Sequence, residues 1–337
     1  MFFNAGMAAD RDVGVALLSA WAGREGRIAR GWEMTAATGV RGLRLLVEAG
    51  ALDAIHLTES NGAAARVLAE NVARYAALGA TMDRTDARRG PPDGPVGYVD
   101  LDPYGSPLSF LEAAIAAVAR PGLLAVTATD MRVLGGADPE AARRRYGGLS
   151  VRGRLGPEAG LRLLLAVLAS RIRAAGAEMR PALAYVGDHH VRAYVVVARA
   201  VQGSDPVETI DPARWDGPPL PPGPPVGPLW TGPLFDANLV RRMRPPATPG
   251  DPTRSGRLLA RFQEEIEADR PFFYESNVLA GLEGLGRPPP VDPWIARLRA
   301  DGWRAARTHA RAGGFRTDAP RAAVVALARS LASVEKR

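Results

Sequence analysis

The stretch "VGYVDLDPYGSPLSFL", residues 96–111, indicates the fold more clearly than any other part of the chain. Its first six residues, 96–101, form the nearly continuous apolar run that a strand buried inside a parallel sheet requires. An Asp-Pro-Tyr-Gly turn, residues 102–105, then ends the strand. The apolar segment that begins at Pro107 is predicted to be helical, because proline fits the first turn of a helix.

Strands and helices alternate in the same way over about 200 residues of the chain. Strands are expected at residues 27–34, 54–60, 81–85, 96–101 and 123–129, and as a hairpin within 181–198. Helices are expected at residues 10–22, from the turn after the first strand to about 49, and at 61–78, 107–119 and 157–175. The pattern predicts an α/β fold with a Rossmann-like parallel sheet, into which the hairpin inserts an antiparallel last strand.

A segment rich in proline and glycine, "DGPPLPPGPPVGP", indicates a domain boundary. We expect a first domain over residues 1–205, a semi-rigid linker over 206–228 and a smaller C-terminal α/β domain over 229–337. Of the net charge of +7, the part from residue 229 onward carries +6. This predicts a C-terminal domain that binds a polyanion, although a biased genome composition would also enrich arginine.

The composition excludes several classes of protein. Without cysteine the chain forms no disulfide and no thiolate metal site, which fits a reducing compartment. The start, "MFFNAGMAADRD", lacks the basic and apolar regions of a signal peptide, and no window of about 18 residues is apolar enough to span a membrane. Four histidines without ligand spacing predict no metal site. We therefore expect a cytoplasmic protein that binds neither membrane nor metal. The sequence leaves the oligomeric state undetermined, and a monomer is the working expectation.

Three strand ends carry residues suited to binding a nucleotide-like cofactor. Ligands of such sheets bind at the carboxyl ends of the strands. Gly39 follows the first strand and would let a ligand approach the backbone, and Glu59, 20 residues further on, could accept both hydroxyls of a ribose. Asp86 follows the third strand and could accept from an adenine amine. An ordinary turn, a solvated strand end and a capping aspartate are the alternative explanations.

The Asp-Pro-Tyr turn offers three parts for methylating an exocyclic amine of a base. Such an amine is a poor nucleophile, and a carboxylate that accepts its N–H bonds stabilises the charge that develops during attack. Asp102 supplies that carboxylate, Pro103 fixes the backbone, and Tyr104 can stack on the base. The alternative is a simple strand-to-helix turn with Tyr104 packed in the core.

Six motifs occur in one order along the chain: "TAATGVRG", "DLDPYGSP", "VTATD", "GPLWTGPL", "FFYESN" and "RTHARAGGFRTDAP". From Phe2 to about residue 330 the sequence resembles the tRNA (guanine-N2)-dimethyltransferase family. The resemblance implies a class I methyltransferase that uses S-adenosylmethionine. It also implies tRNA as partner and guanine 26 as target, with N2-methyl- and N2,N2-dimethylguanosine as products.

The resemblance also implies roles for cofactor-binding residues. Arg11 matches an arginine that holds the methionine carboxylate of the cofactor, and Arg41 matches a second cofactor contact. Glu59 matches the acid that binds the ribose, and Asp86 with Ala87 matches the contact to the adenine. Gly39 lies in the same cofactor motif.

For the substrate, the resemblance assigns Asp102 as the catalytic carboxylate, with Pro103 and Tyr104 beside it. Phe2 and Phe3 match an aromatic pair near the target base, although "FFNAG" departs from the opening typical of the family. Phosphate contacts are expected from a set of arginines, while a solvated helix face would explain some of them equally well. These candidates are Arg143, Arg144, Arg145, Arg241, Arg242, Arg244, Arg304, Arg307, Arg311 and Arg316.

Two other functions remain open from the sequence. One is a methyltransferase acting on a different nucleobase amine, such as an rRNA guanine or a DNA adenine. The residue after Tyr104 is glycine, whereas DNA adenine enzymes favour proline or an aromatic residue there. The other is an RNA-binding protein that keeps the fold without catalysis, although the cofactor-binding acids and Arg11 are all present.

Overall fold

The computed structural model describes residues 3–199, 203–284 and 290–334. It divides into two compact units, each built from segments that are separate in the sequence. The first unit contains residues 1–130, 167–204 and 236–259, and the second contains 131–166, 205–235 and 260–337. None of the helices in the described part of the chain combines the length and apolarity that a bilayer span requires.

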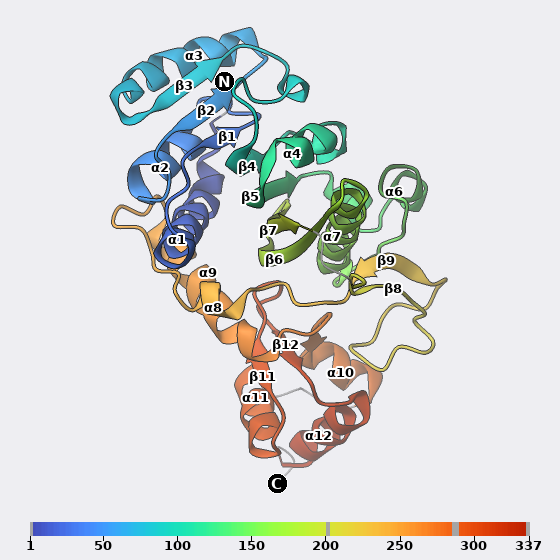
Figure 1. The fold of residues 1–337 in the computed structure, drawn as a ribbon. Helices are drawn as coiled ribbons and strands as arrows, with labels where there is room; N and C mark the ends of the chain where they lie inside the picture. The colour runs from blue at the N-terminus through green and yellow to red at the C-terminus, as the bar shows by residue number, and fades with distance from the viewer. Residues whose placement is uncertain (1–2, 200–202, 285–289, 335–337) are drawn as a thin grey trace. The chain divides into compact units, whose positions relative to one another are not determined.

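A seven-stranded sheet forms the centre of the first unit (Figure 1). In spatial order its strands are β3 (Ala80–Asp83), β2 (Ile55–Thr58), β1 (Gly31–Glu33), β4 (Val96–Leu101), β5 (Val118–Ala128), β7 (Val191–Arg199) and β6 (Ala177–Val186). β7 pairs antiparallel with both β5 and β6, whereas the pairs among β1 to β5 are parallel. The predicted α/β sheet with an antiparallel last strand is therefore confirmed.

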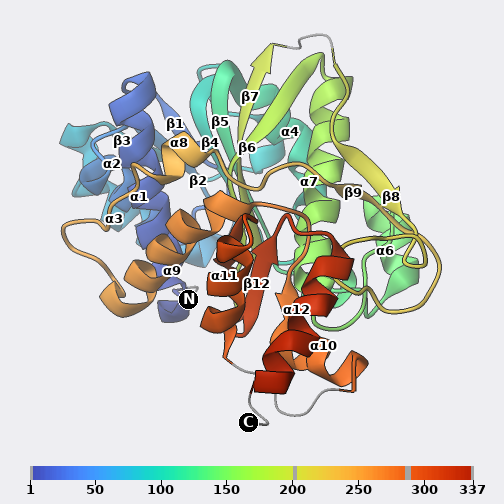
Figure 2. The ribbon, with the colours of Figure 1, turned by 90° about the horizontal axis from the view of Figure 1, so that it is seen from below.

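Helices cover both faces of this sheet. Figures 1 and 2 show α1 and α2 on one face and α4 on the other, where α4 contacts β4 and β5. The helices that belong wholly to the first unit are η1 (Ala5–Met7), α1 (Ala8–Glu25), α2 (Val40–Glu48), α3 (Gly62–Ala73), η2 (Ala76–Leu78), η3 (Ala87–Arg89), η4 (Pro107–Ser109), α4 (Leu111–Ala117) and α8 (Ala237–Val240). α7 (Gly156–Ala174) and α9 (Pro252–Glu265) contribute residues to both units.

The turn between β1 and α2 requires glycine at position 39. Gly39 precedes α2 with a φ of 76°, in the left-handed region that glycine adopts without strain. A Cβ at this position would lie 2.5 Å from Leu68 Cδ1. Any other residue would therefore clash with α3 as well as strain the backbone, so the local structure alone accounts for this glycine.

The second unit has two small antiparallel sheets. One has the order β10 (Tyr274–Glu275), β12 (Gly314–Thr317) and β11 (Ala305–Arg307), and the other pairs β8 (Val207–Ile210) with β9 (Val226–Trp230). The remaining helices are α5 (Met131–Leu134), α6 (Pro139–Tyr146), η5 (Ile266–Ala268), α10 (Ser276–Leu282), α11 (Val291–Ala300) and α12 (Arg321–Val334).

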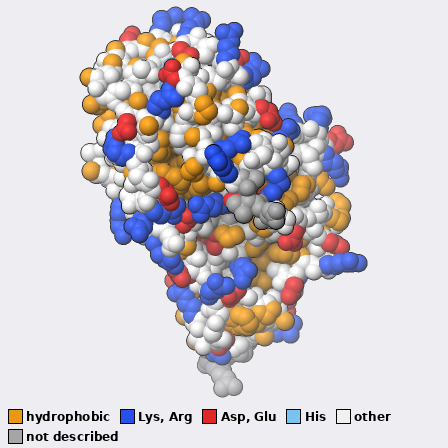
Figure 3. Space-filling model, in the orientation of Figure 1, with side chains coloured by type: hydrophobic (Ala, Val, Ile, Leu, Met, Phe, Trp, Pro, Cys, Tyr) orange, Lys and Arg blue, Asp and Glu red, His pale blue; other side chains and the backbone are white. Residues whose placement is uncertain are grey.

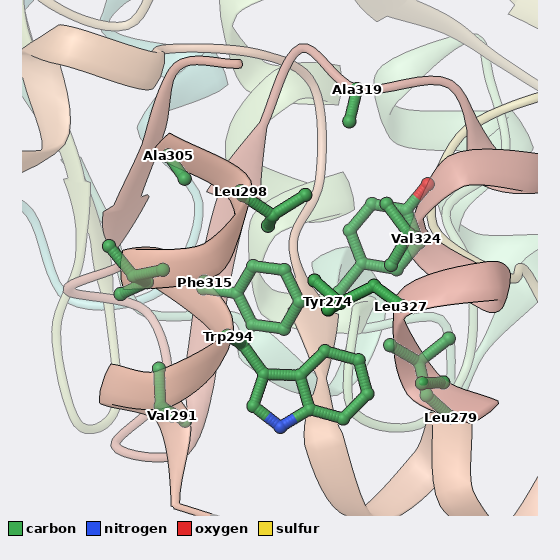
Figure 4. Close-up of a cluster of buried hydrophobic side chains, with 12 residues drawn as sticks. Tyr274, Leu279, Val291, Trp294, Leu298, Ala305, Phe315, Ala319, Val324 and Leu327 are labelled. Carbon is green, nitrogen blue, oxygen red and sulfur yellow. The ribbon is translucent and has the colours of Figure 1, made fainter. Parts of the chain in front are cut away.

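Aromatic side chains form the core of the three-stranded sheet and its helices (Figure 4). The rings of Tyr274 and Phe315 stack with centroids 5.6 Å apart, and Trp294 lies 5.7 Å from Phe315 on centroids. Leu279 and Leu298 close the cluster from α10 and α11. Because each of these side chains is nearly fully buried, the cluster gives this part of the chain a core of its own.

The structure differs from the sequence-based expectations at two places. The helix expected over residues 107–119 is split into η4 and α4, and β5 begins at Val118 because residues 118–122 continue the sheet beside β4 and β7. The segment 206–228, expected to be a linker, contributes β8 and part of β9 to a hairpin.

The compact units do not follow the expected linear division into domains, because the chain leaves each unit and later returns to it. Which segments fold independently stays a prediction.

Fully buried charges connect α7 to the three-stranded sheet within the second unit. Arg316 donates from Nη1 and Nη2 to the two oxygens of Glu158 at 2.8 and 3.0 Å, and from Nε to Glu265. Arg162 also pairs with Glu158, at 2.8 Å, and His309 contacts Glu265 at 2.6 Å. Because Arg316 is fully buried, its prediction as a phosphate contact is wrong.

Replacing the central cation of this network should destabilise the protein. Arg316→Met would leave Glu158 and Glu265 buried with less compensation, so we expect the free energy of unfolding to fall by roughly 3–5 kcal/mol. Urea unfolding at neutral pH measures the change. The matched control is Arg304→Met, whose pair with Asp318 involves an arginine side chain that is 61% exposed and should contribute about 0–1 kcal/mol. Equal losses in the two variants would contradict the account.

Candidate active site

A cavity of about 660 Å³ opens at the carboxyl edge of the sheet in the first unit. Its walls come from the segments that follow β1, β2, β3, β4 and β5, together with residues near the N-terminus. Seven residues that the sequence predicted as site residues line it: Phe3, Glu59, Asp86, Ala87, Asp102, Pro103 and Tyr104. Gly39, Arg11 and Arg41 are not among the lining residues. Phe2 lies outside the described residues.

Glu59 organises the wall between β1 and β2. Its Oε2 accepts from the backbone N–H of Ala37 at 2.8 Å, and its Oε1 accepts from that of Asn61 at 2.7 Å. Ala37 has a φ of 50°, which is strained for alanine and is held by this contact. Each carboxylate oxygen keeps capacity for another donor. Glu59 can therefore accept two hydroxyls while it fixes the turn.

Asp86 caps a turn, which was one of the two roles that the sequence suggested; its contact with an adenine amine stays a prediction. It caps η3 by accepting from the N–H of Arg88 at 3.0 Å, and its carboxylate also pairs with the Arg88 side chain. These hydrogen bonds, the side-chain bond first, lower its pKa to about 2. It also lines the cavity beside the buried Ala87. The carboxylate is thus charged and oriented, and able to accept from a further donor.

Arg11 is a buried cation near two others. Its Nη1 donates to the backbone oxygen of Asn4 at 3.1 Å, and its guanidinium lies 5.1 Å from the ring centroid of Phe3. Burial lowers its pKa, and the charges of Arg41 and Arg44 lower it further. An anion bound beside Arg11 would relieve this repulsion, so the surroundings favour a carboxylate ligand.

Asp102 presents its carboxylate to the cavity from the end of β4. Its Oδ2 accepts from Arg41 Nη2 at 2.6 Å, and its side chain is 22% exposed while that of Arg41 is 7% exposed. Burial alone would raise its pKa, but the charges of Arg41 and Arg192 outweigh burial and lower it. Asp102 is therefore an ionised acceptor that its hydrogen bond to Arg41 holds in place and that remains accessible from the cavity.

Tyr104 is solvent-exposed at the wall of the cavity. It is 96% exposed, whereas Pro103 before it is buried. Gly105 adopts a φ of 84°; its N–H donates to Thr129 Oγ1 at 2.7 Å and its carbonyl accepts from the N–H of Thr129 at 2.9 Å. These bonds fix the turn to the end of β5. The alternative in which Tyr104 packs in the core is therefore wrong.

Sequence reasoning missed several residues of this site. Thr35 lines the cavity, and within the described part of the chain its buried Oγ1 has no hydrogen-bond partner. The same holds for the buried Nη1 of Arg41. Thr129 supports the turn at Gly105. Thr35 and Thr129 each follow the end of a parallel strand, as the predicted acids do, and this position was the signal that could have found them.

The arginines predicted to contact phosphate occur in both units and differ in their surroundings: Arg241, Arg242 and Arg244 belong to the first unit and the others to the second. Arg143 is exposed on α6. Arg304 pairs with Asp318 at 2.7 Å, and Arg307 donates to Asp292 at 2.8 Å. Figure 3 shows basic side chains spread over the visible face with acidic ones among them. Their contact with RNA stays a prediction.

Among the residues that the structure describes, no group of three or more His, Asp or Glu side chains could hold a metal ion.

The sheet order with an antiparallel β7, and the cavity at the carboxyl ends of its parallel strands, define a class I methyltransferase fold. The chain belongs to the N2,N2-dimethylguanosine tRNA methyltransferase family, whose model matches residues 1–210 and 224–329.

Individual relatives agree with this assignment over nearly the whole chain. The chain is 32% identical to the tRNA (guanine(26)-N(2))-dimethyltransferase of Pyrococcus furiosus, covering 95% of this chain and 90% of that protein. It is 30% identical to the enzyme of the same name from Pyrobaculum aerophilum, covering 94% and 86%. The solved structure of Trm1 from Pyrococcus horikoshii with S-adenosyl-L-methionine is similar with a TM-score of 0.83 at 27% identity, covering 96% and 94%.

Glu33 gives a pH dependence of stability at this edge of the sheet. It is buried and accepts from the N–H of Gly42 at 3.0 Å, and burial followed by the charge of Asp100 raises its pKa from 4.5 to about 8. Between these values the folded protein keeps a proton that the unfolded chain has lost. Glu33 therefore lowers stability progressively as the pH rises from 4.5 to about 8.

Glu33→Gln should remove this dependence, because glutamine stays neutral and can still accept from Gly42. The free energy of unfolding of the variant, relative to that of the wild type, should increase by roughly 2–4 kcal/mol between about pH 5.5 and pH 8.5. Urea unfolding of both proteins at the two pH values measures it. A difference between the proteins that does not change with pH would show that Glu33 is ionised throughout.

Proposed function

We propose that this protein transfers methyl groups from S-adenosylmethionine to the N2 amine of guanine 26 in tRNA, giving N2-methyl- and N2,N2-dimethylguanosine. Family membership supports the reaction and the substrate class. The observation that carries the proposal is the position of Asp102: an ionised carboxylate, paired with Arg41 at 2.6 Å, faces a cavity beside an exposed tyrosine.

The residues around the cavity fit the proposed cofactor. Arg11 and Arg41 offer buried positive charge for its methionine carboxylate, and the unpartnered Nη1 of Arg41 in the described structure is a free donor for such a group. Glu59 can accept from the ribose hydroxyls, and Asp86 with Ala87 can contact the adenine. The cofactor supplies a methyl group already activated by its sulfonium charge.

The protein then has to orient a guanine rather than activate it strongly. The target base must leave its stack, at a cost of a few kcal/mol, and the exposed ring of Tyr104 offers a surface on which it can stack. Asp102 accepts an N–H of the amine, which aims the nitrogen and stabilises the positive charge that develops on it.

Each methyl transfer releases one proton from the amine nitrogen. Because its pKa is lowered, Asp102 is a weak base that holds such a proton only briefly. The methylated amine is, however, strongly acidic while it carries the new charge. The proton therefore passes through Asp102 or adjacent water to solvent, and the main contribution of Asp102 is positional and electrostatic.

We also propose that residues 229–337 contribute to binding the body of the tRNA, as the charge of +6 over this range suggests. Binding through phosphates weakens steeply as the salt concentration rises. Arg143, Arg304 and Arg307 are candidate contacts, although Arg304 and Arg307 would have to exchange their present acidic partners for phosphate.

Asp102→Asn should abolish most of the methyl transfer while leaving cofactor binding measurable. The amide cannot balance positive charge on the amine, and loss of one such electrostatic contact typically lowers kcat by about 10²–10³-fold. Transfer of tritiated methyl groups to tRNA, rRNA and DNA, followed by nucleoside mass spectrometry mapped to position, measures activity and target together. Isothermal titration with S-adenosylmethionine checks the site. Wild-type methylation confined to rRNA or DNA would overturn the proposed substrate.

Tyr104→Ala should weaken the use of tRNA by removing the stacking surface. Base–aromatic stacking is worth about 1–3 kcal/mol, so kcat/KM for tRNA should fall by roughly 5- to 150-fold. Tyr104→Phe keeps the ring and should lose much less, which makes it the matched control. Steady-state kinetics with tRNA as the varied substrate decides, and equal losses in the two variants would assign the effect to the hydroxyl instead.

A further inference from the structure

Two aspartates, Asp100 within β4 and Asp102 directly after it, lie within electrostatic range of one arginine. Asp100 is in the last part of the strand, and Asp102 follows the strand's end. Asp100 is fully buried, whereas Asp102 reaches the cavity. Arg41 lies within electrostatic range of both carboxylates, yet its hydrogen bond goes to Asp102. Some other group must therefore satisfy Asp100.

Arg192 on β7 is that group. Its Nη2 donates to Asp100 Oδ2 at 2.6 Å, and its Nη1 donates to the hydroxyl of Thr127 on β5. Tyr98 donates to the same oxygen of Asp100. Arg192 and Asp100 are both fully buried. The sheet thus holds two arginine–aspartate pairs next to each other, one buried and one at the cavity.

The strand register places Asp100 and Arg192 on one face of the sheet. Glu33 of β1 is opposite Asp100 of β4, Asp100 is opposite Ala125 of β5, and Ala125 is opposite Tyr194 of β7. Arg192 precedes Tyr194 by two residues and so shares its face. The arrangement is fixed by backbone pairing across four strands rather than by flexible side chains.

The two aspartates differ in how strongly each needs a cationic partner. A carboxylate buried without a partner costs far more free energy than one that is partly solvated. If Arg192 were absent, Arg41 would be the cation able to compensate Asp100, because it already acts on both aspartates. Asp102 would then lose its hydrogen bond and its fixed direction.

We propose that Arg192 is a positioning residue for methyl transfer: by pairing with Asp100 it leaves Arg41 with Asp102 and keeps the Asp102 carboxylate aimed into the cavity. The proposal rests on the proposed role of Asp102 in methylation. Arg192 itself does not line the cavity, so it acts on the reaction through Asp100, Arg41 and Asp102.

Several charged or titratable groups near Asp102 bear on its protonation. Arg41 from α2, Arg192 from β7 and His190 from the turn before β7 favour its charged form. Glu33 from β1 is raised to a pKa of about 8 in part by the charges of Asp100 and Asp102. The α1 groups Asp10 and Arg11 act on this cluster as well; Asp10 binds His190 at 2.9 Å, and Arg11 repels Arg41. Because the pKa of Glu33 is about 8, its titration does not overlap the acidic limb of the kcat–pH profile.

The test is the pH profile of kcat for Arg192→Met with tRNA as substrate. The wild type should show no acidic limb from Asp102 above about pH 5. In Arg192→Met the acidic limb should lie at least about one pH unit higher than in the wild type, so that it appears in the profile. The value of kcat at neutral pH should also fall roughly tenfold. Asp100→Asn combined with Arg192→Met removes the competing carboxylate as well, so the limb should move back toward the wild-type position.

Arg162→Met is the matched control. It also removes a fully buried arginine from an ion pair, with Glu158 in the second unit. It should lower the thermal midpoint without introducing an acidic limb. A general loss of stability therefore cannot imitate the expected result.

The proposal is overturned if Arg192→Met leaves the pH profile unchanged, or if the double variant keeps the limb of the single one. Should Arg192→Met not fold, Asp100→Asn alone decides. Without the competing carboxylate it should show no acidic limb above about pH 5, and the appearance of one overturns the proposal. An inactive Asp102→Asn beside an unchanged Arg192→Met profile would refute only this inference. A fully active Asp102→Asn would refute the proposed function.

Discussion

The hydrogen bond between Arg41 and Asp102, 2.6 Å long, is the contact on which the site depends. It joins the start of α2 to the end of β4, and it fixes a carboxylate that would otherwise rotate freely at a strand end. Arg41 is nearly buried and Asp102 is partly exposed, so one side of the pair is excluded from solvent and the other is open to the cavity. Charge on Asp102 is thus secured by the protein and still available to a ligand.

Such a pair costs desolvation free energy, because each buried charge needs a nearby group that compensates it. The first unit meets this demand with a layer of polar side chains on the face of the sheet that α1 covers. The helix approaches this layer closely, because a Cβ added at Gly14 would lie only 3.0 Å from the Tyr194 hydroxyl. Asp100 with Arg192, and Asp10 with His190, are members of this layer.

Much of this could be predicted from the sequence, but not the pairing. The apolar run 96–101 and the strand ends at Glu59, Asp86 and Asp102 predicted the sheet and the lining of the cavity, because strand ends of a parallel sheet meet at one edge. Arg192 and Arg316 could not be placed, since an arginine inside an apolar strand looks the same whether it meets a buried acid or solvent. The expectation of one helix over 107–119 failed because residues 118–122 pair with β4 and β7. A linker was expected over 206–228, where the pairing of β8 with β9 instead gives regular structure despite the proline and glycine content.

The central claim is that Asp102 is ionised and held for accepting a hydrogen bond, rather than poised as a strong base. A ¹³C NMR titration of aspartate side-chain carboxyls, with the Asp102 resonance assigned by its loss in Asp102→Asn, measures this directly. Asp102 should titrate below its ordinary pKa of 3.8. A midpoint well above 3.8, near neutral pH, would contradict it and make Asp102 a general base.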